Sequence, residues 1–299
     1  MKLVTDFDPQ YGNAVNLGMG ISRVTARNSG PFTFHGTNTY LIGTRSLAII
    51  DPGPNLDEHF DALMRAIDGR PVSHIFVTHT HNDHTALLSR LVTETGARTV
   101  AEGAHRLSRP LQDQEISPLD ASSDWNFSPD MIARDGSTIV GTDWAIEPVT
   151  TPGHTANHCA YALAGSTFLF SGDHVMAWST TIVAPPDGSM SDYLASLDKL
   201  LLRPERTYLP GHGGPVNNPK SFVKALKTHR KMRERAVLQR VLTGDRTITE
   251  IVRIIYRDID PRLFGAACLS VLAHLEDLVA RKLVRCDGHL SLDASYFPG

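Results

Sequence analysis

Four side chains that bind metal ions well are crowded into one short segment of this sequence. They are His79, His81, Asp83 and His84. Neutral imidazole and carboxylate groups are preferred ligands of zinc and similar divalent ions. In an ordinary surface loop each group would need water or a separate partner, yet this segment directly follows an apolar run at residues 74–78. The spacing therefore predicts a turn whose side chains converge on a metal ion.

Three further residues with the same chemistry occur later in the chain. His154, Asp173 and His212 each follow an apolar or β-type run and lie next to a glycine. Glycine permits a tight turn and a close approach of the backbone to a shared site. Any one of the three, taken alone, is more typical of a turn or of a hydrogen-bonded polar group. Together with the first cluster, they predict one metal centre built from several loops.

The elements that must position these residues alternate between short apolar runs and amphipathic segments. Phe60, Leu63, Met64 and Ile67 have helical spacing, and they alternate with strand-like runs before and after them. Such alternation is typical of layered folds with site residues at strand ends. We predict strands at residues 47–51, 74–78, 98–101, 144–149, 158–162 and 167–170, helices at 57–67 and 85–92, and a surface insertion at 106–135. The runs at 144–149 and 158–162 are expected to pair antiparallel.

From residue 219 onward the pattern becomes mainly helical and the charge changes sign. Residues 219–299 contain 15 Lys and Arg against 9 Asp and Glu, a balance of +6, whereas the preceding residues have a balance of -9. We therefore predict two domains, at residues 1–218 and 219–299. The second would begin with a helix that carries basic side chains on one face. These are Lys220, Lys224, Lys227, Lys231 and Arg235.

The rest of the second domain has the outline of a winged helix. A helix at residues 247–259 would begin with Thr247 as its N-cap and Glu250 as the partner in a capping box. Residues 261–280 predict one or two more helices. A β-hairpin should follow, because an Asp-Gly pair between apolar runs is typical of a tight turn. Its strands are predicted at residues 283–286 and 289–292, around Asp287-Gly288.

The complete series of metal-binding motifs resembles that of the metallo-β-lactamase superfamily. The motif His-x-His-x-Asp-His stands at residues 79–84, and the distant His, Asp and His follow in order. The resemblance covers residues 10–218 and implies an α+β fold, an αββα sandwich with the site at one edge of two packed sheets. It also implies two ion sites. The first would be held by His79, His81 and His154, and the second by Asp83, His84 and His212, with Asp173 bridging the two.

Two divalent ions held in this way would support hydrolysis. Zn²⁺ is the expected metal, with Mn²⁺ or Fe²⁺ as alternatives. Ions about 3.5–4 Å apart can share one hydroxide, because each lowers the pKa of bound water toward about 7. Asp83 is the predicted catalytic residue, since it would hold a metal and also orient the nucleophile or accept its proton. The resemblance makes Asp51 a candidate to orient a ligand, the alternative being a polar turn residue before Pro52.

A closer resemblance lies outside the metal ligands. Residues 31–41, 51–53 and 172–180 are similar to segments of the β-lactamase-like protein 2 group, which appends a winged-helix-like domain. Members of that group resemble single-strand endoribonucleases, and fungal relatives act as thioesterases on carrier-protein-bound polyketides. Ordinary strand, turn or packing roles are the alternative for the polar and aromatic residues of these segments. The candidates for substrate contact are Asn38, Tyr40, Trp178 and Thr180, with His35 and His174 beside them.

Other branches of the superfamily fit this sequence less well. Secreted antibiotic-hydrolysing members usually have a signal peptide and often a Cys where Asp173 stands. Flavo-di-iron oxidoreductases have Glu where His81 stands. The residues present therefore favour hydrolysis over redox chemistry.

Three functions remain open from the sequence. A phosphodiesterase acting on single-stranded RNA is suggested by the basic second domain, although a solvated lysine face is the alternative. A thioester or ester hydrolase, of the glyoxalase II type or acting on acyl-carrier or coenzyme A thioesters, would use the same site. The basic segment would then grip an anionic part of the substrate. A regulatory role, with the winged helix reading duplex DNA, ranks third because the ligand set is complete.

Composition and cysteine usage suggest a location in the cell. The 299 residues are 41% hydrophobic and 20% charged, which is ordinary for a soluble globular protein. Apolar runs such as 47–50 and 167–170 are too short to cross a bilayer, and residues 1–20 lack the apolar stretch of a signal peptide. Three widely spaced cysteines without a C-x-x-C pair favour a reducing compartment. We therefore expect a cytoplasmic protein with no membrane partner, and a homodimer as one option.

Overall fold

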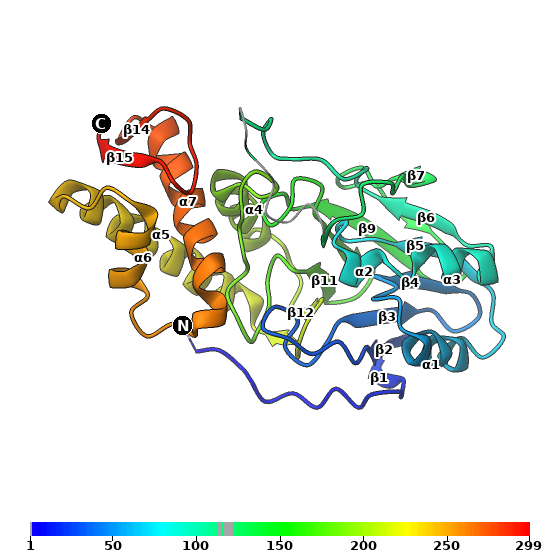
Figure 1. The fold of residues 1–299 in the computed structure, drawn as a ribbon. Coiled ribbons are helices and arrows are strands. Elements are labelled where there is room, and N and C mark those ends of the chain that lie inside the picture. The colour runs from blue at the N-terminus through cyan, green and yellow to red at the C-terminus, as the bar shows by residue number, and fades with distance from the viewer. Residues whose placement is uncertain (1, 113–114, 116–121) are drawn as a thin grey trace.

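Two mixed β-sheets pack face to face in the computed structural model, which describes residues 2–112, 115 and 122–299 (Figure 1). In the first sheet the strands lie side by side in chain order. Neighbours from β1 to β4 are antiparallel, and neighbours from β4 to β7 are parallel. The strands are β1 (Val15–Gly18), β2 (Ile21–Thr25), β3 (Asn38–Ile42), β4 (Leu47–Ile50), β5 (Val72–Phe76), β6 (Arg98–Ala101) and β7 (Met131–Ile132).

The second sheet has the order β13-β12-β11-β10-β9-β8. Strands β11 and β12 run parallel, and the other neighbours run antiparallel. Cys159 of β10 pairs with Thr150 of β9, so the predicted antiparallel pair is confirmed. The strands are β8 (Ile139–Val140), β9 (Ala145–Thr150), β10 (Cys159–Leu163), β11 (Phe168–Gly172), β12 (Thr207–Pro210) and β13 (Val216–Asn217).

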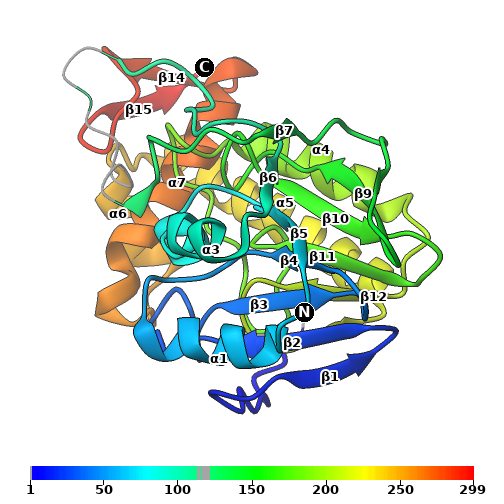
Figure 2. The same cartoon turned by 90° about the vertical axis from the view of Figure 1, so that its right-hand side faces the viewer.

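Helices cover the outer face of each sheet, which gives four layers (Figure 2). Helices α1 (Asp57–Ile67) and α3 (Leu88–Thr95) pack on the first sheet, and α4 (Met190–Leu201) packs on the second. A further core lies between the sheets and contains Phe76 and Tyr161. The predicted α+β class and αββα sandwich are confirmed.

The inner strands of the first sheet are continuous apolar runs because both of their faces are covered. Successive side chains of a strand point to opposite faces. Leu41 and Ile49 accordingly pack with the core under α1 and α3, whereas Ile42 and Ile50 pack with the second sheet. Burying one such side chain stabilises the fold by about 2 kcal/mol.

The predicted insertion at residues 106–135 is only partly a surface feature. Residues 113–114 and 116–121 lie outside the described residues. Of the remainder, β7 joins the edge of the first sheet, and Phe127 and Ala133 are buried in the sandwich. Arg109 pairs with Glu276, which places this segment against the C-terminal helices.

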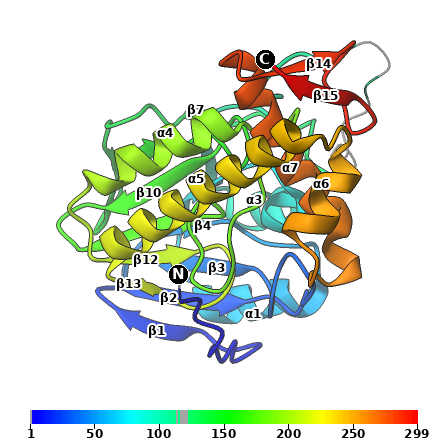
Figure 3. The same cartoon turned by 90° about the vertical axis from the view of Figure 1, so that its left-hand side faces the viewer.

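The C-terminal residues form helices followed by a small sheet (Figure 3). The predicted capping box at the start of α6 is confirmed, because Thr247 and Glu250 exchange side chain to backbone hydrogen bonds. This helix ends at Ile255, earlier than predicted. The elements are α5 (Pro219–Thr243), α6 (Ile248–Ile255), the 3₁₀ helix η2 (Pro261–Leu263), α7 (Phe264–Ala280), β14 (Val284–Asp287) and β15 (Ser295–Pro298).

The second strand of the predicted hairpin was placed wrongly. Residues 289–292 are not a strand, and β14 pairs instead with β15, where Asp287 lies opposite Ser295. The buried Tyr296 decides this register, because its ring enters the C-terminal core and its hydroxyl donates to the carbonyl of Ser291. The connection is therefore a longer loop, not a two-residue turn.

Helix α5 contributes to two cores. Val223 and Leu226 pack with α4 on the second sheet, whereas Val237 and Val241 pack with α6 and α7. Figure 3 shows α5 crossing in front of the sandwich toward the C-terminal helices. The domain boundary between residues 218 and 219 stays a prediction, although α5 begins at Pro219.

Helix α7 is the most apolar helix of the C-terminal part. Over Pro261–Ala280 a window reaches a mean hydropathy of 1.6, so this segment is long and apolar enough, by length and composition, to cross a membrane. Half of that window is buried inside the protein. Its side chains Val271, Leu275 and Leu278 form the core shared with α5 and α6, which accounts for the apolar composition.

Candidate metal centre

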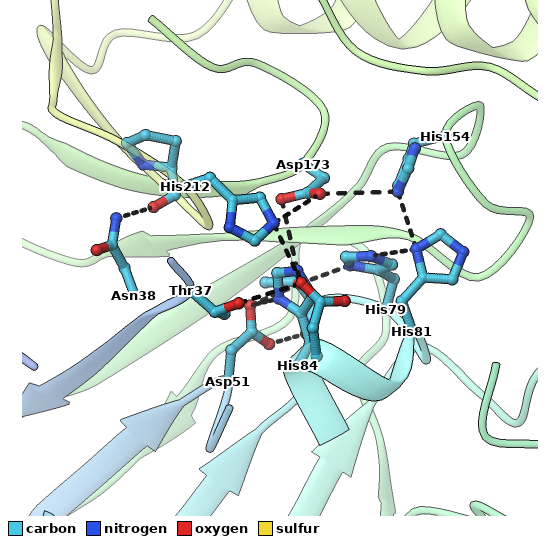
Figure 4. A network of polar contacts seen from close by, with 12 residues as sticks. Thr37, Asn38, Asp51, His79, His81, His84, His154, Asp173 and His212 are labelled. Carbon is cyan, nitrogen blue, oxygen red and sulfur yellow. Dashed lines mark hydrogen bonds and ion pairs between the residues drawn. The ribbon is translucent and has the colours of Figure 1, made fainter. Parts of the chain in front are cut away.

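All seven predicted metal ligands meet at one edge of the sandwich (Figure 4). They come from loops at the ends of several strands, as the sequence predicted. The segment after β5 leads into the short helix α2 (Asn82–Thr85) and carries four of them. The other three follow β9, β11 and β12. The ligand atoms form two main groups, namely His79, His81 and His154, and Asp83, His84 and His212, while Asp173 closes a third group with His79 and His84.

The first group consists of three imidazoles whose ring nitrogens face one point. The Nδ1 atom of His81 lies 2.9 Å from Nε2 of His79 and 3.1 Å from Nε2 of His154. Nitrogens that share a tetrahedral zinc ion at about 2.0–2.1 Å would be about 3.3 Å apart. These imidazoles are therefore spaced as ligands of a single ion.

The outward nitrogen of each imidazole in the first group has its own acceptor. His154 Nδ1 donates to the carbonyl of Ile182 at 2.7 Å, and His81 Nε2 donates to Asp187 at 3.3 Å. Because the Thr78 hydroxyl donates to Asp51, its oxygen accepts from His79 Nδ1 at 3.0 Å. Each partner fixes a tautomer and leaves the inward nitrogen with a free lone pair.

The second group combines imidazoles with carboxylates. His212 Nε2 lies 3.3 Å from Asp83 Oδ2 and 3.2 Å from Asp173 Oδ2. Its Nδ1 atom donates to the carbonyl of Gly36. Asp83 accepts a hydrogen bond from the hydroxyl of Thr37 at 3.1 Å. The groups share Asp173, whose Oδ2 atom also lies 3.9 Å from Nε2 of His154.

Two buried atoms at the centre of the site fit a divalent cation. His84 Nε2 and Asp173 Oδ1 face one another at 3.6 Å, and neither has a hydrogen-bond partner among the described residues. Buried polar atoms are rarely left without a partner, so such a pair calls for one. Once Nε2 of His84 has lost its proton, this nitrogen and the carboxylate oxygen are both ligands that zinc accepts. The donor set therefore fits the divalent ions that the superfamily generally binds.

The electrostatics of the two groups differ. Burial lowers the pKa of His154 to about 4 and, helped by neighbouring histidines, lowers that of His79 well below its usual value. These two imidazoles are neutral at pH 7. Burial alone would lower the pKa of His212 too, but the Asp173 and Asp83 carboxylates outweigh it and raise that pKa to about 10. An ion entering the second group must displace this proton.

Asp51 lies beneath both groups, where the resemblance had suggested a residue that orients a ligand. Its Oδ2 atom accepts from His84 Nδ1 at 2.9 Å and from the Thr78 hydroxyl at 2.8 Å. Its Oδ1 atom accepts from the backbone N–H of Thr78. The Asp51 backbone has a φ of 54°, in the left-handed region, which Asp tolerates better than most residues. This turn aims the carboxylate into the site.

Asn38 and Tyr40 are buried, so their predicted contact with substrate disagrees with the structure. They are 0% and 3% exposed. The Asn38 amide donates to the carbonyls of Pro210 and Gly213, and the Tyr40 hydroxyl donates to Pro210 at 2.7 Å. Their polar atoms are thus occupied in holding the loop that carries His212.

Trp178 and Thr180 are half-buried and follow Asp173 along the chain. The Trp178 ring stacks on Phe34 at 4.8 Å between centroids and 9° between planes. A side chain at Gly213 would collide with Trp178, so the indole lies directly against the His212 loop. Substrate contact by Trp178 and Thr180 stays a prediction. His174, in contrast, is fully buried and packs on Tyr193.

Two residues that support the site were missed in the sequence. Asp187, which is 1% exposed, holds His81, and His158 Nε2 accepts from the backbone N–H of Asp173 at 3.2 Å. Asp187 lies 106 positions from His81, in a Pro-Pro-Asp-Gly stretch that is typical of a turn and gives no sign of a contact with His81. In the sequence, the one hint of a role for His158 is that it lies close to His154. No motif marks His158 as a residue of the site.

Comparison with known proteins agrees with this geometry. Residues 32–212 match the family described as the metallo-beta-lactamase superfamily, and residues 247–291 match the beta-lactamase associated winged helix domain. A beta-lactamase-like protein 2 homolog from Caenorhabditis elegans is 30% identical over 251 residues, which cover 81% of this chain and 78% of that protein. An atrochrysone carboxyl ACP thioesterase from Paecilomyces divaricatus is 27% identical over 300 residues, covering 95% and 85%.

A solved structure supports the fold along nearly all of the chain. A beta-lactamase domain protein from Burkholderia ambifaria superposes with a TM-score of 0.79 at 22% sequence identity, covering 98% of this chain and 96% of that one. The predicted winged-helix outline is thereby confirmed together with the sandwich. The chain belongs to the metallo-beta-lactamase superfamily of hydrolases and carries that superfamily's associated winged helix domain.

Proposed function

We propose that this hydrolase cleaves thioester bonds of acyl substrates at a centre of two zinc ions, with ester bonds as the related class. The observation that carries the proposal is the aromatic pair beside the site. Phe34 and Trp178 stack on each other, and Trp178 lies against the loop that carries His212. An acyl chain gains free energy by covering such rings, whereas a phosphodiester backbone requires cationic partners.

Further aromatic rings pack beside the pair formed by Phe34 and Trp178. Phe34 also packs against His35 at 4.1 Å between centroids, and Phe7 packs against both rings. Phe32, in the same loop, is half exposed. An apolar substrate portion placed over these rings would bring its carbonyl carbon next to the second ligand group. This arrangement supports a substrate with an apolar acyl part.

The residues of the second group have a defined part in the reaction. Bound divalent ions supply a water of lowered pKa and polarise the carbonyl of the substrate. The Asp83 side chain is 28% exposed, more than His84, His212 or Asp173, and its carboxylate is held by Thr37. Burial would raise the pKa of Asp83, but His84 and His212 outweigh it and keep the carboxyl ionised. Asp83 therefore accepts a hydrogen bond from the attacking water.

The bonds balance without a further reactant. The oxygen of water bonds to the acyl carbon, and the carbon–sulfur bond breaks. One proton of that water passes to the leaving sulfur, while the ionised Asp83 carboxylate holds the water by a hydrogen bond, so the products are a carboxylic acid and a thiol. Asp83 orients the water, which is one of the two roles that the sequence suggested for it, the other being to accept the proton of the water.

Relatives of this chain support the same substrate class. The protein from Paecilomyces divaricatus is named an atrochrysone carboxyl ACP thioesterase and matches 95% of this chain. A thioesterase of the same name from Aspergillus aculeatus is 30% identical over 239 residues. An acyl group linked to a carrier through sulfur is therefore the first substrate to test.

The test compares two reactions on the same zinc-loaded protein. We expect turnover of long-chain acyl-coenzyme A and weak or no turnover of bis(p-nitrophenyl) phosphate. Trp178→Ala should raise KM for the long-chain substrate by about 10-fold, since it removes about 1–2 kcal/mol of apolar contact, and should leave KM for acetyl-coenzyme A nearly unchanged. Efficient phosphodiester cleavage without thioester cleavage would reject the proposal.

A second candidate function, cleavage of single-stranded RNA, has one observation in its favour. Lys220, Lys224 and Lys231 of α5 are exposed, whereas Lys227 pairs with Asp198 of α4. Exposed lysines on one helix can follow phosphates. Lys224→Glu with Lys231→Glu should then abolish RNA binding that weakens steeply with salt. An absence of cleavage of any RNA would end this candidate.

The proposal also includes the identity of the metal, the location of the protein in the cell and its oligomeric state. The three cysteines are free thiols, which suits a reducing compartment such as the cytoplasm. Imidazole and carboxylate ligands suit Zn²⁺, with Mn²⁺ or Fe²⁺ as alternatives that elemental analysis distinguishes. A homodimer stays a prediction, to be tested by light scattering of the purified chain.

A further inference from the structure

A buried arginine connects the C-terminal helices to the candidate metal centre. Arg230 of α5 is 3% exposed, and it forms no ion pair within the part of the chain that the structure describes. A buried cation without a carboxylate partner is costly and therefore uncommon. Its Nε atom has no hydrogen-bond partner among the described residues. The guanidinium is held in place by other contacts.

Those contacts reach three separate elements. One terminal nitrogen of Arg230, Nη2, donates to the backbone carbonyl of Thr181. The other, Nη1, donates to the hydroxyl of Ser270 on α7 at 3.4 Å. The guanidinium carbon lies 5.2 Å from the ring centroid of Tyr193 on α4. Arg230 thus bridges the C-terminal helices and the loop that follows β11.

The loop held by Arg230 supports two of the predicted metal ligands. The Thr181 hydroxyl lies within hydrogen-bonding distance of the backbone carbonyl of Asp173 at 2.7 Å and of the next carbonyl, that of His174, at 2.9 Å. The next residue, Ile182, offers its carbonyl to His154 Nδ1 at 2.7 Å. Moving Thr181 would therefore displace the acceptor that sets the tautomer of His154 and the carbonyl contact behind Asp173.

A second contact fixes the same backbone from α4. The Tyr193 hydroxyl donates to the carbonyl of His174 at 3.1 Å, directly beside Asp173. Arg230 lies over the Tyr193 ring, so one guanidinium restrains both the Thr181 carbonyl and the tyrosine behind His174. The bond to the Thr181 carbonyl is charge-assisted, which makes it stronger than a neutral hydrogen bond.

We propose that Arg230 is a positioning residue through which the C-terminal helices hold His154 and Asp173 in the geometry that binds metal. The inference rests on the metal centre of the proposed function. Helices α5 and α7 would then contribute to the affinity of the centre for metal ions. The contacts of Arg230 are with Thr181, Ser270 and Tyr193, none of which is a predicted metal ligand, so it acts through the Thr181–Ile182 backbone.

The test measures metal binding by the full chain, not turnover. Arg230→Gln removes the charge and the forked donor while keeping a shorter polar side chain. The matched control is Arg233→Gln on the same helix, because Arg233 donates to the carbonyl of Ile255 and lies over Tyr256, away from the site loops. Cobalt(II) is added to metal-free protein, its visible absorption is recorded, and its affinity is measured by competition with a chelator.

We expect the Arg230 and Arg233 variants to differ in their affinity for cobalt(II). Arg230→Gln should lower cobalt affinity by about 10–100-fold, the usual effect of losing a residue that orients a ligand, and should change the visible spectrum. Arg233→Gln should leave both within about 2-fold. Arg230→Lys should restore part of the affinity, since it keeps one charged donor but not the fork. A folded Arg230→Gln protein with wild-type cobalt affinity and spectrum would overturn the inference.

Two milder variants cover the case in which Arg230→Gln does not fold. Thr181→Val removes the hydroxyl contacts to the carbonyls of Asp173 and His174, and Ser270→Ala removes only the contact of Arg230 with α7. Both should weaken cobalt binding by several-fold while circular dichroism stays unchanged. Wild-type affinity in both would count against the inference. If the wild-type chain itself binds no cobalt, the proposed function fails and not merely the role of Arg230.

Discussion

The carboxylate of Asp51 and the imidazole of His84 form a buried hydrogen bond of 2.9 Å between Oδ2 and Nδ1. Because Nδ1 of His84 donates to Asp51, Nε2 is the nitrogen that faces Asp173. The same carboxylate accepts from Thr78, whose oxygen in turn faces His79. One buried carboxylate therefore orients a ligand in each of the two groups.

Replacing Asp51 should affect both stability and metal binding. In Asp51→Asn the amide cannot accept from His84 and Thr78 as the carboxylate does, so a buried donor loses its partner. We expect the free energy of unfolding of the metal-free chain to fall by about 2–4 kcal/mol and the zinc affinity to fall by about 10–100-fold. Urea unfolding and chelator competition measure the two effects.

The control for Asp51 is an exposed aspartate. The Asp57 side chain is 90% exposed and pairs with Arg90 at the surface. Asp57→Asn should change the unfolding free energy by less than about 0.5 kcal/mol. Unchanged zinc affinity in Asp51→Asn would contradict the orienting role.

Asp187 should control the first ligand group specifically. Asp187→Asn keeps the shape of the side chain but weakens the acceptor for His81 Nε2. We expect the variant to fold normally and to lose one of its two ions at chelator concentrations that leave the wild-type protein loaded, because loss of such a partner costs about 10–100-fold in affinity. Elemental analysis after dialysis counts the ions. Two ions retained at the same chelator concentration would show that His81 needs no such partner.

Asn38 should act on stability and rate, not on substrate binding. In Asn38→Ala the carbonyls of Pro210 and Gly213 lose their donor, and the hydroxyl of Thr25 loses its acceptor. We expect a loss of about 2–3 kcal/mol in unfolding free energy and a lower kcat, because the His212 loop is released. KM should stay within about 2-fold. A rise in KM at constant kcat would restore the substrate-contact role that the sequence suggested.

His274 of α7 should make the fold sensitive to acid. Burial, with Arg230, His229 and Arg233 nearby, lowers the pKa of His274 to about 3 from the usual 6.5. Between pH 6.5 and 4 the unfolded chain therefore binds a proton that the folded chain excludes. The free energy of unfolding contributed by this group falls by up to about 1.4 kcal/mol for each pH unit in that window.

A variant that cannot take up this proton tests the prediction. His274→Leu should show a shallower loss of stability between pH 6.5 and 4 than the wild-type chain, measured by urea unfolding at each pH. The two curves should run parallel above pH 7, where the histidine is neutral in both states. Equal acid slopes would contradict the prediction.

The ligand set could be predicted from the sequence because its residue types are chemically unusual and its spacing is local. His79, His81, Asp83 and His84 stand within one turn, and the apolar run before them identified the strand that presents them. Helix α1 was equally readable, since Leu63 and Ile67 repeat at helical spacing and are buried. Local patterns of this kind need no knowledge of the tertiary fold.

Features that depend on tertiary packing could not be predicted in this way. Asp187 is a single acidic residue in a turn, and only the folded chain brings it to His81. Asn38 was a candidate for substrate contact in the sequence, although the loop from β12 covers it. Likewise Tyr296 enters the C-terminal core, and this contact, not the Asp-Gly pair, decides which strand pairs with β14.

We propose that the seven converging side chains form a centre for two metal ions. The most direct measurement is a crystal structure of the zinc-loaded chain with anomalous data collected at the zinc edge. We predict two anomalous peaks, one among His79, His81 and His154, the other among Asp83, His84 and His212, with Asp173 in contact with both. Peaks absent from this edge of the sandwich in protein that has been supplied with zinc would contradict the account.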